Sequence, residues 1–367
     1  MSKETAFHPR LAALTNEWMD LFGYFAPSVV TGVEEEYRAV RETAGLMDFT
    51  MLRKVDLDGP GALELVNSVV GRDVSKLRPG QIAYGPLVDE DGKMVDDCTV
   101  LPRGDGRVRF CGANDRDFEI FSSQAEGTGI EVREFTDAMP HLCLQGPRSR
   151  EILQPLADQD LSNESFPYYT FREDVSIAGV PIFMTRLGYT GELVYELWVD
   201  RDRALELWDA LLEAGEPQGM KVIGMTALDL FRIEGGFIIG GVEYDPSVSP
   251  FECGLGWAVS FDKPDVRGRA GLERDRDGTT LRLTSVVLES GGDDATGAPL
   301  SVGGFITQAV VSPYLGGKTL GLAKVPADVA RAPGTQLTAT VGGEEVPGEI
   351  APHPVYDKER RRAKETA

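Results

Sequence analysis

The chain has 367 residues, of which 42% are apolar and 26% are charged, a composition typical of folded enzymes and not of disordered proteins. This length exceeds what one hydrophobic core usually organises, so it predicts two or three domains. The 59 acidic residues outnumber the 37 basic ones, and the formal net charge of -22 argues against nucleic acid as a partner.

The chain has little raw material for disulfides, metal centres or membrane insertion. Its four cysteines are far apart and form no Cys-x-x-Cys pair, which predicts free thiols in the reducing cytoplasm. Three widely spaced histidines lead us to expect neither a metal site nor a Ser-His-Asp triad. The first residues lack a signal-peptide core and no stretch reaches ~20 apolar residues, so no membrane association is expected.

Hydrophobic periodicity predicts the elements of the first part of the chain in order. The amphipathic pattern at 33–40 predicts a helix that closes at Gly45. A strand and a short helix follow, and then a run of antiparallel strands joined by tight turns, over the ranges 54–58, 62–70, 84–88, 94–101 and 108–111. Such a run predicts mixed antiparallel structure and not repeated βαβ units.

The pattern restarts at residue 142 and changes character again near residue 268. Strands are predicted near 142–145, 174–177 and 181–186, and helices at 147–156, 203–214 and 225–234. Short glycine-rich strands over 281–348 predict a separate β domain, and the charged residues 358–367 predict a solvated tail. The fold class is therefore α+β, with mixed antiparallel sheets and a C-terminal β domain.

Two adjacent carboxylates follow a tight turn in the segment 92–97 (Gly-Lys-Met-Val-Asp-Asp). Successive strand residues point to opposite faces, so Asp96 and Asp97 face different environments. One of them can line a cavity while the other meets solvent or a cation. A polar turn with both acids solvated is the simpler interpretation of this segment taken alone.

Two further motifs place charged groups next to apolar ones. Glu196 lies between two apolar residues of a predicted strand, and a carboxylate buried there needs a hydrogen-bond donor. On the predicted helix 225–234, Arg232 follows Asp229 by three residues. The two side chains pair on the helix surface, or Arg232 orders site acids or meets an anionic ligand; the motif alone favours neither interpretation.

Taken in order, these segments resemble the aminomethyltransferase family, typified by the T-protein of the glycine cleavage system and its folate-dependent demethylase relatives. The similarity runs over nearly the whole length, and the ordered set of short motifs makes it specific. The motifs include 44–48 (Ala-Gly-Leu-Met-Asp), 92–97, 144–147 (Leu-Gln-Gly-Pro), 188–192 (Gly-Tyr-Thr-Gly-Glu), 230–236 (Leu-Phe-Arg-Ile-Glu-Gly-Gly) and 250–257 (Pro-Phe-Glu-Cys-Gly-Leu-Gly-Trp).

The resemblance implies a three-domain T-protein-like architecture around a folate-holding opening. Residues 1–50 and 140–270 would form a discontinuous folate-binding domain, residues 51–139 a second α+β domain that carries Asp96, and residues 271–367 a C-terminal barrel-like β domain. Tetrahydrofolate is the implied co-substrate, and no metal is expected.

The resemblance also implies roles for individual residues. Asp96 would lie beside the folate nitrogens as the catalytic carboxylate, and Glu196 would hold the pterin. The other expected folate contacts are Tyr84, Asn114, Tyr189 and Arg232, and the expected donor contacts are Tyr24, Met51 and Trp257. A buried carboxylate can accept adjacent pterin N–H groups, and a second one can stabilise the cationic N5 and take its proton.

Departures from the family pattern bear on the one-carbon donor. Residues 49–52 (Phe-Thr-Met-Leu) replace a Ser-His-Met triplet, and Leu228 replaces an arginine of the family's helix motif. These changes argue against docking of a lipoylated carrier protein and favour a paralogue that moves a methyl group from a small N-, O- or S-methylated compound to N5 of tetrahydrofolate. The alternatives are the aminomethyltransferase of glycine cleavage and a folate-binding protein without transferase chemistry.

Overall fold

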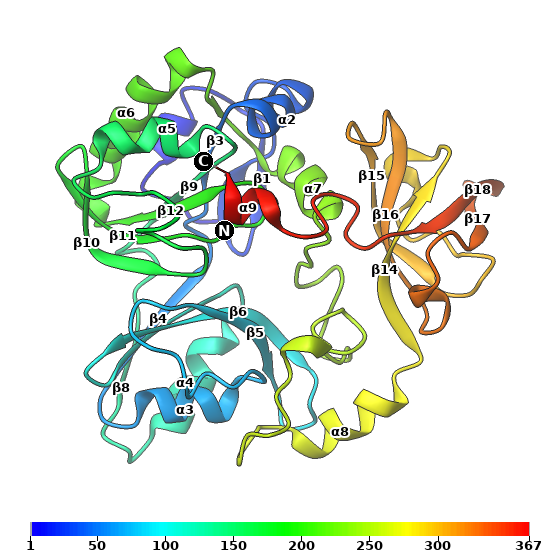
Figure 1. Cartoon of the computed structure of the whole chain (residues 1–367), viewed down its shortest axis with the longest axis horizontal. Helices are drawn as coiled ribbons and strands as arrows, with labels where there is room; N and C mark the ends of the chain where they lie inside the picture. The colour runs from blue at the N-terminus through cyan, green and yellow to red at the C-terminus, as the bar shows by residue number, and fades with distance from the viewer. Residues whose placement is uncertain (1, 367) are drawn as a thin grey trace.

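The computed structural model describes residues 2–366, and its strands form three larger sheets and one small hairpin. In Figure 1 the three sheets lie in three lobes, with the third set apart from the other two. The α+β class with mixed antiparallel sheets is therefore confirmed.

The first lobe is built on a six-stranded sheet of order β10-β11-β12-β9-β3-β13. Its strands are β3 (Gly45–Asp48), β9 (His141–Gln145), β10 (Phe171–Ile177), β11 (Val180–Thr185), β12 (Val194–Val199) and β13 (Lys221–Val222). Its helices are α1 (His8–Leu11), α2 (Val33–Glu42), α5 (Ser149–Leu153), α6 (Ala204–Gly215) and α7 (Met225–Glu234), with the hairpin β1 (Trp18–Leu21) and β2 (Tyr24–Pro27). The chain leaves this sheet after β3 and returns at β9, so the sheet joins two separated stretches of sequence.

The second lobe is the intervening stretch, which forms a five-stranded antiparallel sheet of order β5-β6-β7-β4-β8. Its elements are β4 (Arg53–Asp58), α3 (Ala62–Val69), β5 (Ala83–Val88), β6 (Met94–Gly104), β7 (Arg107–Gly112), α4 (Arg116–Ala125) and β8 (Glu131–Glu134). The alternating apolar residues of these strands pack against α3 and α4 in one buried cluster. The elements from β4 to β7 follow the sequence prediction, whereas α4 and β8 were not predicted.

The third lobe is a five-stranded antiparallel sheet of order β15-β16-β14-β18-β17, reached through α8 (Arg269–Gly278). Its strands are β14 (Leu281–Leu288), β15 (Phe305–Ser312), β16 (Lys318–Pro326), β17 (Gln336–Val341) and β18 (Glu344–Ala351). The sheet encloses its own apolar core, as the glycine-rich alternation of this region predicts.

The structure corrects the end of one predicted helix and adds order to the tail, most of whose described residues are exposed as predicted. The helix α2 ends at Glu42, and the next residues form β3, whose four residues are all buried between β9 and β13. The tail is also ordered: α9 (Arg361–Glu365) crosses back to the first lobe (Figure 1), where Arg186 and Arg150 donate hydrogen bonds to its last backbone carbonyls. The buried Arg186 and the partly buried Arg150 satisfy a helix end that the sequence alone could not place.

A buried ion cluster fixes this return of the C-terminal segment. The Arg41 guanidinium lies 2.9 Å from the Glu192 carboxylate and 2.6 Å from that of Glu234. Its carbon also stacks 3.6 Å from the ring centroid of Tyr356. Arg41 therefore ties α2, the loop before β12 and α7 to the C-terminal segment.

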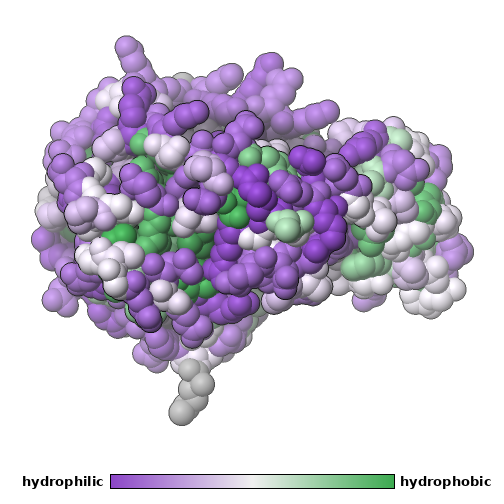
Figure 2. Space-filling model, turned by 90° about the horizontal axis from the view of Figure 1, so that it is seen from below, coloured by the Kyte–Doolittle hydropathy of each residue, from purple (hydrophilic) through white to green (hydrophobic). Residues whose placement is uncertain are grey.

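The surface is mainly polar, in keeping with the charge of the chain. Figure 2 shows hydrophilic residues over most of the lower face, with apolar patches between them. Within residues 2–366 we find no helix with the length and apolarity needed to cross a lipid bilayer.

Candidate active site

A pocket opens where the first and second lobes meet. Its wall combines the segment after β3, the strands β5, β6 and β7 of the second lobe, Glu196 of β12, and the start of α7 with the loop that follows it. The space between these walls measures about 1010 Å³ when the part open to solvent is included.

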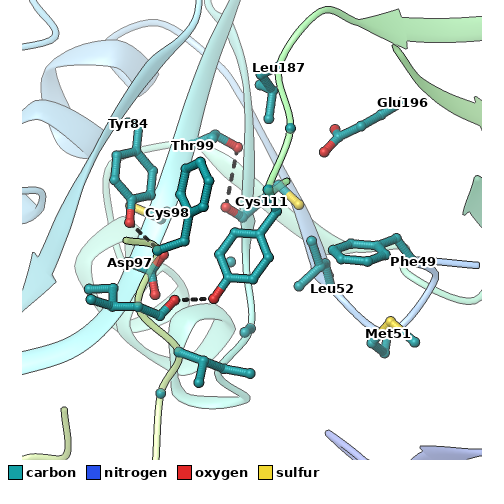
Figure 3. A pocket seen from close by; sticks show the side chains of 18 of the residues that line it. Phe49, Met51, Leu52, Tyr84, Asp97, Cys98, Thr99, Cys111, Leu187 and Glu196 are labelled. Atoms are coloured by element: carbon teal, nitrogen blue, oxygen red, sulfur yellow. Dashed lines mark hydrogen bonds between the residues drawn. The ribbon is translucent and has the colours of Figure 1, made fainter. Parts of the chain in front are cut away.

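Apolar and aromatic side chains dominate this wall, and its charged members are two carboxylates. Among the described residues, Asp97 and Glu196 line the pocket, and no lysine, arginine or histidine does. Figure 3 places the two acids on opposite sides, with Tyr84 beside Asp97. A ligand held here therefore meets negative charge at two separate points and no positive charge on the pocket wall.

Glu196 is fixed by the sheet of the first lobe. It pairs in register with Thr185 of β11 and with Cys143 of β9. The Thr185 hydroxyl donates to Glu196 Oε2 at 2.7 Å, and the Trp198 indole N–H donates to the same oxygen at 3.3 Å. Burial raises the pKa of Glu196, while these donors and the Lys54 ammonium oppose the shift. Oε1 remains available to accept hydrogen bonds from a ligand.

Asp97 is held by two tyrosine hydroxyls. Tyr84 donates to Oδ2 at 2.8 Å, and Tyr244 lies 2.6 Å from Oδ1. Burial is the main cause that raises the pKa of Asp97, and the neighbouring Asp96 carboxylate adds to it, which brings the pKa to about 7. Asp97 therefore changes its charge near neutral pH, as a general base must.

Asp96, the predicted catalytic carboxylate, faces the other way. Its Oδ2 accepts the backbone N–H groups of Ala113 and, at 3.1 Å, of Asn114, and its side chain lies with the buried face of β6. Asp96 does not line the pocket, whereas Asp97 does. Asp97 is therefore the candidate for the catalytic role that the resemblance implied for Asp96, its neighbour on the Tyr244 hydroxyl.

Three other predicted residues, Met51, Tyr84 and Tyr189, line the pocket together with Glu196. The Tyr189 hydroxyl donates to the Ile238 carbonyl, which joins the two sides of the wall. Trp257 is 65% exposed, and its ring lies 6.5 Å from that of Tyr84. It thus borders the pocket from the solvent side without lining it.

The structure places the remaining predicted residues elsewhere. Arg232 is buried and binds Glu243 and Asp229, so its partners lie within the protein. Asn114 donates its amide N–H to the Val95 carbonyl. The Tyr24 hydroxyl donates to Asp137 at 2.6 Å. None of these three side chains lines the pocket, although Arg232 also donates to the carbonyl of Phe237, which does.

Behind Glu196 lies a buried group that could hold a metal by its residue types. One potential ligand atom each from His141, Cys143 and Glu196 lies within 4.8 Å of the other two. The Lys54 ammonium is buried nearby, donates to two backbone carbonyls, and lowers the pKa of His141 together with burial. A positive charge beside the cluster disfavours a cation there, so we assign Glu196 to the pocket and not to a metal.

Some of the wall was not predicted. The loop 237–240 and the residues Thr99 and Leu187 line the pocket, and Tyr244 supports it from behind. The only sequence signal for this loop was the pair of glycines that ends α7.

Comparisons with family models and with individual relatives identify the family to which this chain belongs. Residues 7–263 match the GCVT N-terminal domain, and residues 267–357 match the glycine cleavage T-protein C-terminal barrel domain. The chain belongs to the glycine cleavage T-protein (aminomethyltransferase) family. It is therefore an enzyme of a family that uses tetrahydrofolate as a substrate, as the resemblance implied.

Individual relatives span the same range of the chain. An aminomethyltransferase of Halothermothrix orenii is 33% identical, and the match covers 92% of this chain and 95% of the relative. A trimethylamine-oxide aldolase of Ruegeria pomeroyi is 32% identical over 99% of this chain, which corresponds to 48% of that protein. The structure of the glycine cleavage system aminomethyltransferase T from Bartonella henselae covers 98% of this chain and 99% of its own, with a TM-score of 0.87 at 23% identity, and so shares the fold.

Proposed function

We propose that this enzyme transfers a methyl group from a small, uncharged or cationic methylated compound to N5 of tetrahydrofolate. The single observation that carries the proposal is the pair of separated carboxylates, Asp97 and Glu196, on an otherwise apolar and aromatic wall. The two acids suit the two polar demands of the reaction, which are recognition of the pterin and removal of a proton from N5.

Glu196 would receive the pterin edge. Adjacent N–H donors of the pterin can be accepted by a carboxylate whose other oxygen is already fixed by Thr185 and Trp198. The buried charge then gains partners, which offsets part of its desolvation cost.

Asp97 would lie beside N5. When the N5 lone pair attacks the donor carbon, the N5–C bond forms, the bond from carbon to its leaving group breaks with its electron pair, and N5 becomes cationic. Asp97 stabilises that charge and accepts the N5 proton. The aromatic wall around it excludes water and holds donor and acceptor in line.

The charge of the wall selects among donors. With two acids and no cationic side chain among the described lining residues, a donor carboxylate would have no partner in the pocket. A cationic or neutral donor avoids this repulsion, and a cation also gains from the faces of Tyr84, Tyr189 and Phe22. The trimethylamine-oxide aldolase relative is named for an uncharged methylated nitrogen compound of this kind.

The second candidate is the aminomethyltransferase reaction of glycine cleavage. The names of the full-length relatives favour it, whereas the departures at residues 49–52 and at Leu228 disfavour a lipoylated carrier as donor. Met51 and Leu228 both line the pocket with apolar groups.

Mass spectrometry of the folate product separates these reactions. The enzyme is incubated with tetrahydrofolate and, in turn, with matched cationic, neutral and carboxylated methyl donors and with the aminomethyl-lipoyl carrier. We expect 5-methyl-tetrahydrofolate from a cationic or neutral donor, and its formation about 10²- to 10⁴-fold more slowly by the Asp97→Asn variant. Formation of 5,10-methylene-tetrahydrofolate from the carrier alone would establish the second candidate, and folate binding without any product would support a non-catalytic role.

A further inference from the structure

Behind Asp97 the structure holds a compact group of carboxylates that the reaction itself does not require. The Tyr244 hydroxyl lies 2.6 Å from Asp97 Oδ1 and 2.9 Å from Asp96 Oδ1, and it accepts the backbone N–H of Asp97 at 3.1 Å. A hydroxyl has one proton, so Tyr244 can donate to only one of the two acids at a time. The charge state of Asp96 therefore affects the hydrogen bonding of Asp97.

A third acid, Asp117 of α4, completes the group. Its side chain is fully buried, and neither of its oxygens has another hydrogen-bond partner within residues 2–366. A Cβ atom at Gly112 would collide with Oδ2 of both Asp96 and Asp117, so the two carboxylates converge on that glycine. Two ionised carboxylates that approach the same glycine would repel each other strongly, and one proton shared between them removes this repulsion.

The other hydrogen-bond partners of Asp96 and Asp117 decide which of the two acids carries the shared proton. Asp96 accepts the backbone N–H groups of Ala113 and Asn114, which favour its ionised form. Burial, the Asp96 charge and a hydrogen bond to Asp96 all raise the pKa of Asp117, and the backbone N–H of Asn114 is the donor that opposes them. Neither Asp117 oxygen meets a donor at hydrogen-bond geometry within residues 2–366, so Asp117 is the acid that carries the proton. The described ion pairs include neither residue with a lysine or arginine, so no buried cation takes the place of that proton.

We propose that Asp117 holds a proton shared with Asp96, and that Tyr244, which bridges Asp96 and Asp97, is the positioning residue that sets the pH at which Asp97 accepts a proton from N5. This inference rests on the proposed function for the role of Asp97. The shared proton between Asp96 and Asp117 stands independently of it, since it follows from the buried geometry alone.

The other titratable side chains that face this group are uncharged at neutral pH, so its charge comes from the three carboxylates. The other titratable side chains that face it are two tyrosines and three cysteines, each with a pKa raised mainly by burial, so that they stay neutral at neutral pH: Tyr84 of β5, Cys98 of β6, Cys111 of β7, Tyr189 and Cys253. With one proton on Asp117, the group carries one negative charge beside Asp97 instead of two. That single charge lets Asp97 ionise near neutral pH.

Two variants test the proposal, each with a readout that a purely structural role would not change. Tyr244→Phe removes one donor from Asp97 and should move the acid limb of the pH profile of turnover up by about one pH unit. Because Tyr244 does not line the pocket, the dissociation constant of tetrahydrofolate should not change. An unchanged acid limb in a folded Tyr244→Phe enzyme would overturn the role of Tyr244.

Asp117→Asn tests the proton. If Asp117 is already neutral, the substitution removes no charge and leaves the acid limb of the pH profile in place. An acid limb that moves to lower pH means that Asp117 was ionised and refutes the shared proton.

Infrared spectroscopy above neutral pH tests the same proton without a methyl donor. The wild type should show the C=O stretch of a protonated carboxylic acid, and Asp117→Asn should lack it. If no transfer reaction is found, this measurement still decides the shared proton, so the two failures are distinguishable.

Discussion

Replacing either of the two adjacent acids by asparagine should separate catalysis from folding. Asp97 lines the pocket between two tyrosine hydroxyls, whereas Asp96 points into the second lobe and binds the backbone N–H groups that follow β7. We expect Asp97→Asn to lose turnover without losing stability, and Asp96→Asn to lose stability and keep most of its turnover.

The magnitudes follow from these contacts. Loss of a general base lowers a rate by about 10²- to 10⁴-fold, which is the expected fall in kcat for Asp97→Asn. The pKa of Asp97 is raised to about 7 from an ordinary 3.8, so its neutral form is the one that favours folding: that contribution is present below pH 3.8 and is lost as the pH rises through about 7. Asparagine never ionises, so at higher pH the variant should gain up to roughly 4 kcal/mol over the wild type.

Asp96→Asn removes a charged acceptor from two backbone N–H groups and should cost about 1–3 kcal/mol in the free energy of unfolding. Its kcat should stay within about tenfold of the wild type, because the Asp97 carboxylate remains. The assay is kcat at saturating tetrahydrofolate, together with urea denaturation of both variants at one pH above neutral. A stable Asp96→Asn enzyme without turnover, beside an active Asp97→Asn enzyme, would refute the reasoning.

Three further predictions concern the pterin site, the pH dependence and the return of the C-terminal segment. Glu196→Gln should weaken tetrahydrofolate binding by about 10- to 100-fold, measured by calorimetry, because hydrogen bonds to a charged acceptor contribute about 1.5–3 kcal/mol. Thr185→Val removes only one hydrogen bond to that acid and should weaken binding less. Equal affinities of the wild type and Glu196→Gln would exclude Glu196 from the pterin site. Turnover should be present above pH 7 and fall below it as Asp97 gains a proton, and a profile flat between pH 5 and 8 would contradict this. Arg41→Gln leaves the buried Glu234 without its cation and leaves Glu192 with only Arg362 at 3.5 Å, and it should cost about 3–5 kcal/mol in thermal denaturation. Arg38→Gln, on the same helix but exposed, should cost under about 0.5 kcal/mol. Similar losses in both variants would show that the buried cluster is not what stabilises the junction.

Local patterns of apolar and polar residues predict much of the fold. The antiparallel strands of the second lobe and the helices α6 and α7 lie where alternation and helical periodicity predict them, because each buries one face against its own lobe. The pattern fails where a segment is buried on all sides or docks far along the chain. β3 is four buried residues between two partners that come almost 100 and 180 positions later, and the tail is ordered by Arg150 and Arg186, which its own sequence does not contain.

The same limit of local sequence patterns explains why the candidate catalytic residue is Asp97 and not its neighbour Asp96. Alternation predicts that Asp96 and Asp97 face opposite ways, but it does not say which one faces the pocket. The pairing of β5 with β6 shifts register between Leu87 and Val88, opposite Val95, just before the two acids. Such a bulge reverses which face a residue occupies. Asp96 thereby lies on the face that carries Val100 into the core of the second lobe, and Asp97 is left at the pocket.

Two acids on one wall can then serve different steps because their surroundings differ. Burial raises the pKa of both, and two neutral donors oppose this at each acid. The Lys54 ammonium also opposes it for Glu196, whereas Asp97 has the Asp96 carboxylate beside it. Glu196 is thereby suited to remain an anion that accepts pterin N–H groups, and Asp97 to exchange a proton near neutral pH. The division of roles depends on neighbours and not on the acids themselves. A cation placed beside Asp97 would lower its pKa and make it a poorer acceptor for the N5 proton, even with every pocket contact unchanged.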